Sequence, residues 1–180
     1  PARSSATASA GTTLASASAD GTVRLWLVGE ARAAARSDAV ATLAEHRGDV
    51  YSVCLHPTEH SLLSAGYDKT VRLWDVPSCT MVRALHGHEL AVRQAVFNAT
   101  GNLLLSGSKD GSVRFWDARS GLCVNKLDAG LGEVTSVRLS CNGAQLRTSS
   151  NDNAIRLWDV RAARPLRAFK GHQNTAKNFV

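Results

Sequence analysis

The stretch Val71-Arg72-Leu73-Trp74-Asp75 decides the fold, because closely similar stretches recur in one phase along the chain. All four tryptophans of the 180-residue chain close such a run. The four runs are Val23-Arg24-Leu25-Trp26, Val71-Arg72-Leu73-Trp74, Val113-Arg114-Phe115-Trp116 and Ile155-Arg156-Leu157-Trp158. Three of them continue with aspartate, and the last two intervals are 42 residues each. A repeat of this length predicts an array of small, similar β-sheets.

Further positions keep the same phase. Six residues before each tryptophan stand Asp20, Asp68, Asp110 and Asp152, and ten residues before stand Ser16, Ser64, Ser106 and Thr148. Twenty-eight residues before the last three tryptophans stand His46, His88 and Gly130. Asp20-Gly21 and Asp110-Gly111 are strong hairpin signals, so the aspartates are predicted to lie in turns between strands. Buried polar groups must be paired, and this set predicts a repeated hydrogen-bonded network.

On these motifs the chain, from Gly11 to Val180, resembles the WD-repeat β-propeller family. The resemblance implies an all-β fold of about three and a half four-stranded blades, part of a ring of about seven. In that family the His, Ser or Thr, Asp and Trp of one repeat form a hydrogen-bonded tetrad. By position, the complete tetrads are His46, Ser64, Asp68, Trp74 and His88, Ser106, Asp110, Trp116. With Gly130 in the histidine position, Asp152 must find another donor.

The repeat phase predicts the domain organisation. Residues 1–10 are expected to be disordered or irregular, and residues 11–45 to form a partial blade with a loop insertion at 29–39. Complete blades are expected at 46–87, 88–129 and 130–170, with the start of a further blade at 171–180. An open stack of this kind would expose strand edges and apolar faces at both ends, so the chain is expected to be roughly half of a ring of about seven blades, or to obtain the missing blades from elsewhere.

Composition limits the classes of partner. No run approaches the ~18 apolar residues of a membrane span, and the start has no apolar signal-peptide region, so no membrane association is expected. The four cysteines, none in a CxxC motif, favour a reduced cytoplasmic or nuclear protein. The net charge is +6. Arg24, Arg72, Arg114 and Arg156 share one repeat position, so we interpret them as strand side chains over neighbouring surface, and nucleic-acid binding is not expected.

Catalysis, metals and cofactors are not expected either. A Ser-His-Asp set suggests a hydrolase, but a nucleophile needs one exposed site, whereas this set recurs from blade to blade. A hydrolase built on a propeller would instead need a single, unrepeated cluster. His56, His60 and the His86-x-His88 pair lack a cysteine or carboxylate cluster to complete a metal site.

The family resemblance implies a non-catalytic scaffold or adaptor that binds proteins or peptides on the top face of the propeller, not a small-molecule ligand. The positions that match are the starts of the first strands and the residues just before the turn aspartates. They are Tyr51, Arg93, Thr135 and Tyr67, Lys109, Asn151. Because tyrosine and arginine are common binding hot spots, Tyr51, Tyr67 and Arg93 are the strongest candidates.

Two narrower interpretations remain open. Trp116-Asp117-Ala118-Arg119 and Trp158-Asp159-Val160-Arg161 resemble the WDxR signature of cullin-4 ubiquitin ligase substrate receptors, in which Arg119 and Arg161 would contact the adaptor. The segment Asn151–Asp159 with Lys170–Asn174 resembles the histone-methyltransferase scaffold of the COMPASS/MLL type. The two phenylalanines expected in the channel of that scaffold align with Tyr51 and Val180.

Overall fold

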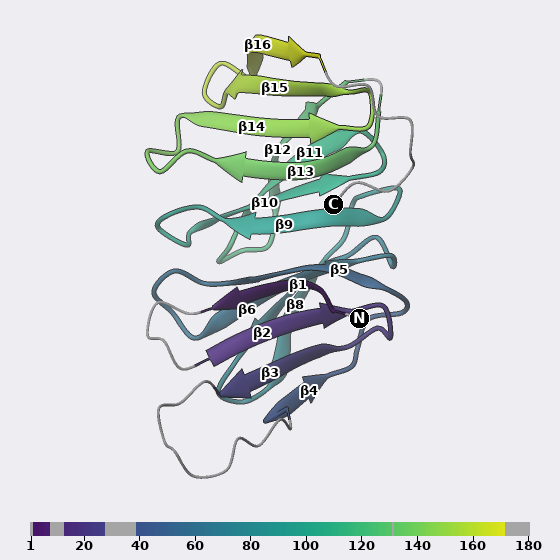
Figure 1. The fold of residues 1–180 in the computed structure, drawn as a ribbon. Helices are drawn as coiled ribbons and strands as arrows, with labels where there is room; N and C mark the ends of the chain where they lie inside the picture. Colours follow the sequence, from purple (N-terminus) through teal and green to yellow (C-terminus); the bar gives the residue numbers. More distant parts are fainter. Residues whose placement is uncertain (1, 8–12, 28–38, 131, 172–180) are drawn as a thin grey trace.

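The structure, a computed structural model, describes residues 2–7, 13–27, 39–130 and 132–171. The described residues form strands and turns without an α-helix (Figure 1). The strands are β1 Ala2–Thr7, β2 Thr13–Ser18, β3 Val23–Leu27, β4 Ala41–Leu43, β5 Val50–Leu55, β6 Ser61–Gly66, β7 Val71–Asp75, β8 Thr80–Leu85, β9 Val92–Phe97, β10 Leu103–Ser108, β11 Ser112–Asp117, β12 Cys123–Asp128, β13 Val134–Leu139, β14 Gln145–Ser150, β15 Ala154–Asp159 and β16 Arg164–Lys170.

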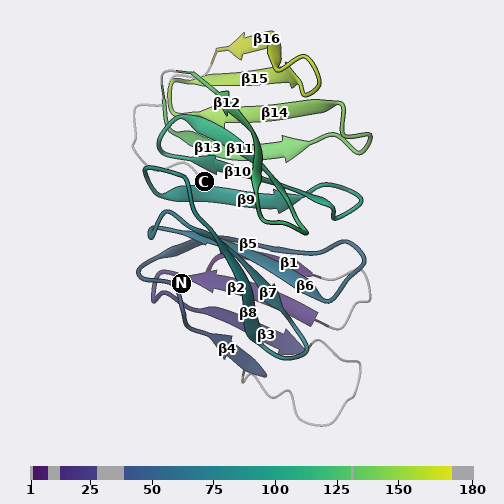
Figure 2. The same ribbon diagram turned by 180° about the vertical axis from the view of Figure 1, so that it is seen from behind.

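Four antiparallel sheets, each of four strands in sequence order, lie one after another along the stack. We call them blade A (β1–β4), blade B (β5–β8), blade C (β9–β12) and blade D (β13–β16). The first strands of successive blades lie next to one another, and the second strand of each blade packs on the first strand of the next. Blades A and D lie at opposite ends of the stack in both views (Figures 1 and 2). The fold is therefore all-β and consists of partial-propeller blades.

Local sequence explains the blade geometry. Each third strand places one arginine between two apolar residues, with a β-branched residue before it and Leu or Phe after it, as half-buried strands do. Each first strand also carries a β-bulge immediately after its first residue, for example between Val50 and Ser52 in blade B. A bulge adds one residue and redirects its side chain, which here occurs at the same edge of every blade.

The core lies between the blades rather than at one centre. Three apolar clusters occupy the A–B, B–C and C–D junctions. Each cluster contains the tryptophan of the later blade, namely Trp74, Trp116 and Trp158. These three indoles are buried, whereas Trp26 of blade A is only half-buried because no described blade precedes it. Each blade is thus stabilised mainly by its neighbours.

The structure differs from the sequence prediction at the N-terminus. Residues 2–7 form β1, which pairs with β2, so blade A has four strands instead of a partial set. The segment Ala-Arg-Ser-Ser-Ala-Thr lacks apolar alternation, and it is a strand because β2 offers an open edge. The strands of blades B, C and D fall within 46–87, 88–129 and 130–170. Most of the predicted 29–39 insertion and of the 171–180 segment lies outside the described residues.

Candidate functional site

The turn between the second and third strands positions one aspartate in each blade. In blade B, Asp68 Oδ1 accepts the backbone N–H of Thr70 at 3.2 Å and its hydroxyl at 2.7 Å. In blade C, Asp110 Oδ1 accepts the same two groups of Ser112 at 2.9 and 2.6 Å. Aspartate favours such turns because its short side chain reaches its own backbone two residues ahead. The second carboxylate oxygen is left to face the preceding blade.

In blade B that oxygen meets His46, in the loop that joins blades A and B. His46 Nδ1 lies 2.9 Å from Asp68 Oδ2, and His46 Nε2 lies 2.6 Å from Ser64 Oγ. The Trp74 indole N–H donates to Ser64 Oγ at 2.8 Å. The four side chains predicted from the repeat therefore meet in one buried chain of hydrogen bonds, and Arg47 N–H adds a bond of 3.2 Å to Asp68 Oδ2.

Blade C repeats the arrangement. His88 lies 2.8 Å from Asp110 Oδ2 and 2.7 Å from Ser106 Oγ, and Trp116 donates to Ser106 at 2.8 Å. Burial alone would raise the pKa of Asp68 and Asp110, but the hydrogen bonds from His46 and His88, with those from the turn, outweigh it. The pKa of both carboxyls is therefore held well below the usual range, and both are carboxylates at neutral pH.

Blades A and D keep only part of the network. Trp26 donates to Ser16 and Trp158 donates to Thr148, each at 2.9 Å. In blade D, Gly130 stands in place of the histidine, and a Cβ at Gly130 would lie only 2.9 Å from the Arg156 guanidinium. Arg156 thus takes the space that a histidine would need.

In blade D, Arg156 replaces the missing histidine as the donor to the turn aspartate. Its guanidinium donates to Asp152 Oδ2 at 2.5 Å and to Oδ1 at 3.2 Å. This hydrogen bond lowers the pKa of Asp152 to about 2, despite the opposing effect of burial. The repeated arginines were predicted to cover neighbouring surface, and the structure adds a second role for three of them, as partners of the turn aspartates. Arg24 and Arg72 also pair with the aspartate of their own turn, each at 3.1 Å. Arg114 is the exception, and its Nε is buried with no hydrogen-bond partner among the described residues.

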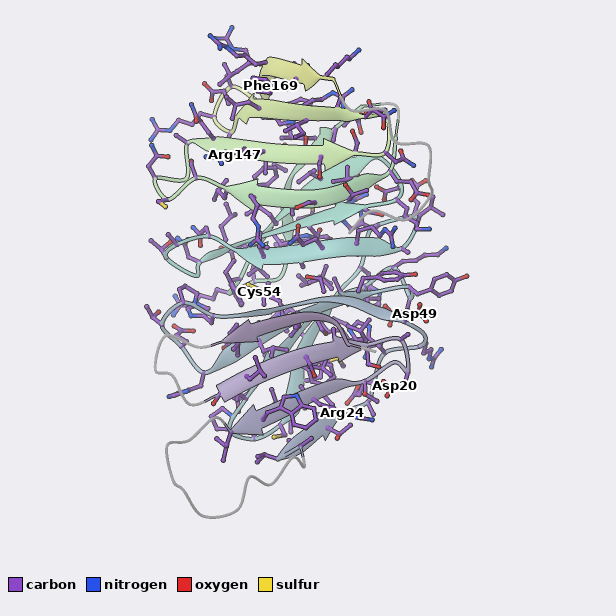
Figure 3. The ribbon with its side chains drawn as sticks, viewed as in Figure 1. Asp20, Arg24, Asp49, Cys54, Arg147 and Phe169 are labelled. Atoms are coloured by element: carbon purple, nitrogen blue, oxygen red, sulfur yellow. The ribbon has the colours of Figure 1, made fainter. Side chains whose placement is uncertain are left out.

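The bulges bring the first set of predicted binding residues to one edge of the blades. We call this edge the top rim; it faces right in Figure 3, where Asp20 and Asp49 mark it. Tyr51, Arg93 and Thr135 are the bulge residues of blades B, C and D. The Arg93 guanidinium carbon lies 5.0 Å from the centre of the Tyr51 ring, so these two residues join adjacent blades in a cation–π pair. Thr135 instead donates its hydroxyl to the carbonyl of Ser149 at 3.2 Å.

The second predicted set lies on the same rim. The backbone N–H groups of Tyr67, Lys109 and Asn151 donate to the residues just before the first strands, at 2.8, 2.9 and 3.0 Å. This shared bond places each of the three residues beside the first strand of its blade. The Tyr67 side chain is 62% exposed, an unusual exposure for a large aromatic residue.

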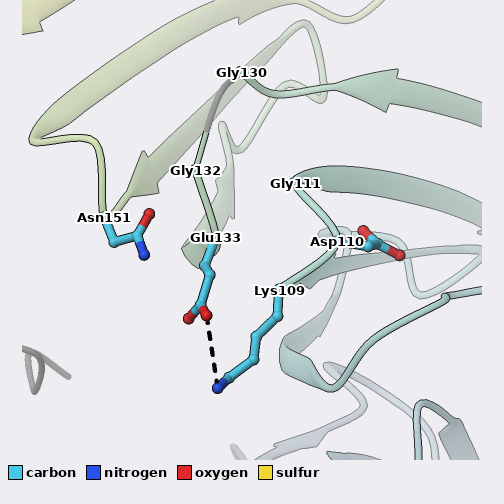
Figure 4. Close-up of a pocket in the computed structure, with 7 residues that line it drawn as sticks. All are labelled: Lys109, Asp110, Gly111, Gly130, Gly132, Glu133 and Asn151. Atoms are coloured by element: carbon cyan, nitrogen blue, oxygen red, sulfur yellow. Dashed lines mark ion pairs between the residues drawn. The ribbon is translucent and has the colours of Figure 1, made fainter.

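An open depression of about 390 Å³ lies on the top rim between blades C and D (Figure 4). Lys109, Glu133 and Asn151 provide its side chains, and Gly111, Gly130 and Gly132 provide exposed backbone. Lys109 Nζ lies 3.7 Å from Glu133, within ion-pair distance. The depression is polar and adjoins the predicted binding residues.

The two arginines of the WDxR matches lie at the opposite edge. Both are exposed in the turns between the third and outer strands. Asp159 accepts the N–H groups of Arg161 and Ala162 at 2.9 and 3.0 Å, which fixes the turn and leaves the arginine side chain outside. Arg119 also borders a cavity of about 520 Å³ between blades B and C, with His56 and Phe97 on its wall. The two sets of candidates therefore cannot contact the same small epitope.

Two further residues on the first strands were not predicted from the sequence. Gln94 Oε1 accepts the hydroxyl of Ser136 and the N–H of Val137, both at 2.8 Å, and so joins the first strands of blades C and D. Arg3 occupies the bulge position of blade A. Its distance from Trp26 equals that of Tyr51 from Trp74, a signal that could have identified it.

Within the described part of the chain, no three His, Cys, Asp or Glu side chains converge as a metal site would require. Nor does that part contain a helix long and apolar enough to cross a membrane.

Comparison with known proteins agrees with this architecture. Residues 3–26, 37–75, 79–117 and 121–159 each match the family model described as WD domain, G-beta repeat. Pre-mRNA-processing factor 19 of Bos taurus is 42% identical over 53 residues, 29% of this chain and 10% of that protein. Nuclear distribution protein PAC1 of Komagataella phaffii is 34% identical over 86 residues, 47% of this chain and 17% of that protein. Human WD repeat-containing protein 37 is 36% identical over 63 residues, 34% of this chain and 13% of that protein. The chain thus spans less than a fifth of these relatives.

Proposed function

Because this chain belongs to the WD-repeat family, we propose that it is a non-catalytic protein-interaction scaffold that binds a partner protein or peptide on its top rim. The residues proposed to contact the partner are Tyr51, Tyr67, Arg93, Lys109, Thr135 and Asn151. A small-molecule ligand, a cofactor, nucleic acid and a membrane have no part in this proposal.

The observation that carries the proposal is the aromatic and cationic pair at the centre of the rim. Arg93 lies over the Tyr51 ring, and Tyr67 exposes its own ring on the same edge of blade B. Tyrosine and arginine supply much of the affinity of protein interfaces, because each combines a large contact area with hydrogen bonding. The Tyr51–Arg93 contact also holds both side chains in place before a partner arrives, which lowers the entropy lost on binding.

The geometry of the tetrads favours binding over catalysis. Ser64 and Ser106 are fully buried. Each of their oxygens already accepts an indole N–H and faces a histidine nitrogen. A nucleophilic hydroxyl must reach the substrate, and these cannot. The Ser-His-Asp sets therefore have a structural role in this proposal.

Substitution of the central pair tests the proposal. Proteins captured from cell extract by the tagged chain are compared, by quantitative mass spectrometry, with those captured by Tyr51→Ala/Arg93→Ala. Lys126→Ala, an exposed lysine on the outer strand of blade C, is the matched control. We expect specific partners to fall at least about tenfold with the double variant and to remain with the control. Unchanged capture by a folded double variant would exclude the top-rim site.

A second candidate function rests on the opposite edge. The exposed side chains of Arg119 and Arg161, on turns fixed by Asp117 and Asp159, favour docking to the adaptor of cullin-4 ubiquitin ligases. Binding of the purified adaptor that Arg161→Ala abolishes, and Tyr51→Ala does not, would support this function. Binding of a histone H3 tail peptide, lost with Tyr51→Ala, would support the chromatin alternative instead.

We also propose a cytoplasmic or nuclear location. Cys54, Cys79, Cys123 and Cys141 are free thiols. Burial raises the pKa of the Cys54 thiol, which keeps it protonated. Fractionation of cells that express the tagged chain tests the location, and recovery in the secreted fraction would contradict it.

A further inference from the structure

The depression between blades C and D exists because two side chains are absent from the loop that joins these blades. Gly130 and Gly132 stand at the repeat positions that His88 and Leu90 occupy one blade earlier. The missing side chains leave about 390 Å³ open on the top rim. The residues that line this volume come from blades C and D and the loop between them, so the depression is formed by two neighbouring blades (Figure 4).

The matching junction between blades A and B is covered by Tyr67. A Cβ at Gly48, the repeat equivalent of Gly132, would lie only 3.1 Å from Cδ1 of the Tyr67 ring. In blade D the equivalent of Tyr67 is Asn151, and a Cβ at Gly132 would overlap Asn151 Oδ1. Asn151 therefore borders the depression with a polar atom, where blade B has a ring that covers the loop.

The depression presents mainly oxygen atoms. A Cβ at Gly111 would lie 3.2 Å from the carbonyl oxygen of Gly130 and 3.5 Å from that of Gly132, so both carbonyls face blade C. No backbone N–H of a described residue donates to either of them. Asn151 Oδ1 and the Glu133 carboxylate add further acceptors. Such a lining favours a ligand that has several N–H donors and a positive charge.

Lys109, the one cationic residue in the described lining, is held weakly. Its Nζ lies 3.7 Å from Glu133 Oε1, which is an ion-pair distance beyond the range of a normal hydrogen bond. The two side chains are 32% and 35% exposed, and ion pairs at such positions contribute little to stability. The other carboxylate of the lining, Asp110, is occupied by the tetrad of blade C. A better donor to Glu133 can therefore displace Lys109 at little cost.

We propose that the depression binds the unmodified ammonium group of a lysine from the partner, an inference that rests on the top-rim function proposed above. An ammonium group has three donors, which match the Glu133 carboxylate and the carbonyls of Gly130 and Gly132. A methylated lysine has lost donors and is usually bound by an aromatic cage, whereas none of the described lining residues is aromatic. An anionic ligand would face the Glu133 carboxylate.

Lys109 is an internal competitor in this proposal. In the free chain its ammonium group pairs with Glu133, and the partner's lysine takes over that carboxylate on binding. Lys109 then lies beside a group of the same charge, which it repels. Loss of the Lys109 charge should therefore tighten binding, whereas loss of the Glu133 charge should weaken it. An anionic ligand would give the opposite signs, so the two residues together identify the charge of the ligand.

A titration with a lysine peptide tests the site directly. The probe, acetyl-Gly-Ala-Lys-Ala-Gly-amide, is added to the ¹⁵N-labelled 180-residue chain. The backbone NMR signals of Gly111 and Gly132 and the side-chain amide signals of Asn151 report binding. We expect saturable shifts of these signals, and a Kd that rises at least about tenfold when the peptide lysine is acetylated or trimethylated.

Variants of the two charged residues give the sign of the effect. We expect Glu133→Gln to raise the Kd at least about tenfold and Lys109→Gln to lower it about threefold. The matched controls are Glu59→Gln, at the opposite edge, and Lys126→Gln, on the outer strand of blade C. They make the same changes of net charge at exposed positions and should bind like the wild type. Thermal unfolding of each variant checks that it is folded.

Several outcomes would overturn the proposal. Equal Kd values for the unmodified and the acetylated peptide would show that the ammonium group is not recognised. Weaker binding by Lys109→Gln would make Lys109 a contact for an anion. Calcium chloride that shifts the same signals and displaces the peptide would make the depression a metal site. Peptide binding seen only in Lys177→Gln would assign the depression to that lysine of the chain.

Capture of partners from cell extract separates this proposal from the top-rim function. Partners lost with Tyr51→Ala/Arg93→Ala but kept with Glu133→Gln would leave the top-rim function intact and overturn the lysine contact. Partners kept with both variants would refute the top-rim function, and with it a partner lysine, whatever the peptide does. Partners lost with both variants, together with the expected peptide result, would support the proposal.

Discussion

Replacement of Asp110 by asparagine should destabilise the chain strongly, although the two side chains have nearly the same shape. Each carboxylate oxygen of Asp110 accepts two hydrogen bonds. Oδ2 accepts from His88 Nδ1 at 2.8 Å and from Glu89 N–H at 3.0 Å. Oδ1 accepts from the N–H and the hydroxyl of Ser112 at 2.9 and 2.6 Å. Whichever way the amide is oriented, its NH₂ group faces a backbone N–H that cannot become an acceptor.

The magnitude follows from that count. The Ser112 hydroxyl can rotate and His88 can change tautomer, so one backbone N–H is the least that is left unpaired. An unpaired buried donor costs about 1–3 kcal/mol, and the remaining bonds lose the strength that a charged acceptor gives them. Because the Asp110 side chain is only 10% exposed, we expect a loss of about 2–4 kcal/mol in the free energy of unfolding. That is a large fraction of the about 5–15 kcal/mol of a typical domain.

Urea unfolding of the full chain, followed by tryptophan fluorescence, measures this loss. The matched control is Asp20→Asn, the same position in blade A, where the side chain is 45% exposed and pairs with an exposed Arg24. Water can satisfy the groups that Asp20 leaves, so the control should lose less than about 1 kcal/mol. Equal losses in the two variants, or a loss below about 1 kcal/mol for Asp110→Asn, would refute the argument that the tetrad carboxylate is a structural acceptor.

Three further outcomes are expected. Gly101→Ala should lower the free energy of unfolding by about 2–4 kcal/mol, because φ is +77° and a Cβ would overlap the ring of buried His56. The control Gly143→Ala, at φ +70° with open space, should lower it by only about 1–2 kcal/mol in the same urea unfolding assay. Equal losses in the two variants would exclude the clash. The pKa of Asp152 is about 2 in the folded chain against an ordinary value of 3.8, so its stabilisation should be complete above about pH 4 and be lost as the pH falls to about 2. The stability difference between the wild type and Asp152→Asn, measured across that range, should therefore shrink as the pH falls, and a constant difference would contradict it. A double-mutant cycle on Tyr51 and Arg93 should give a coupling of about 0.5–1 kcal/mol in thermal unfolding, and a value near zero would show that the pair is not held in the free chain.

The sequence was sufficient for features that repeat at fixed spacing. The common phase of Trp74, Ser64 and Asp68 predicted which side chains meet, and the repeat phase predicted the ranges that enclose the strands of blades B, C and D. Both succeed because the same local rule acts in each blade. The strand at residues 2–7 was missed because it owes its form to pairing with β2 and not to its own composition.

The contacts of charged side chains were predicted less well than the apolar pattern of the strands. In the linear sequence four arginines share one repeat position, so they were interpreted as strand side chains over neighbouring surface. Arg138 and Arg147 are separated along the chain and become opposite neighbours only through the register of β13 and β14. Likewise, Arg156 replaces the histidine at Gly130 because the two positions face each other across a blade junction. Contacts of this kind depend on how strands align, which composition and spacing cannot supply.

The histidines of the complete tetrads sit in the loops between sheets, and this has a consequence for how the chain unfolds. Each His–Ser and His–Asp bond contributes to the coupling between neighbours, not to the intrinsic stability of one sheet. In a linear array of this type, the strength of each boundary sets how many units open together. The C–D boundary has lost its histidine and keeps the Gln94 bonds and the apolar cluster. Of the three boundaries between the described blades, the C–D boundary is therefore expected to separate most easily.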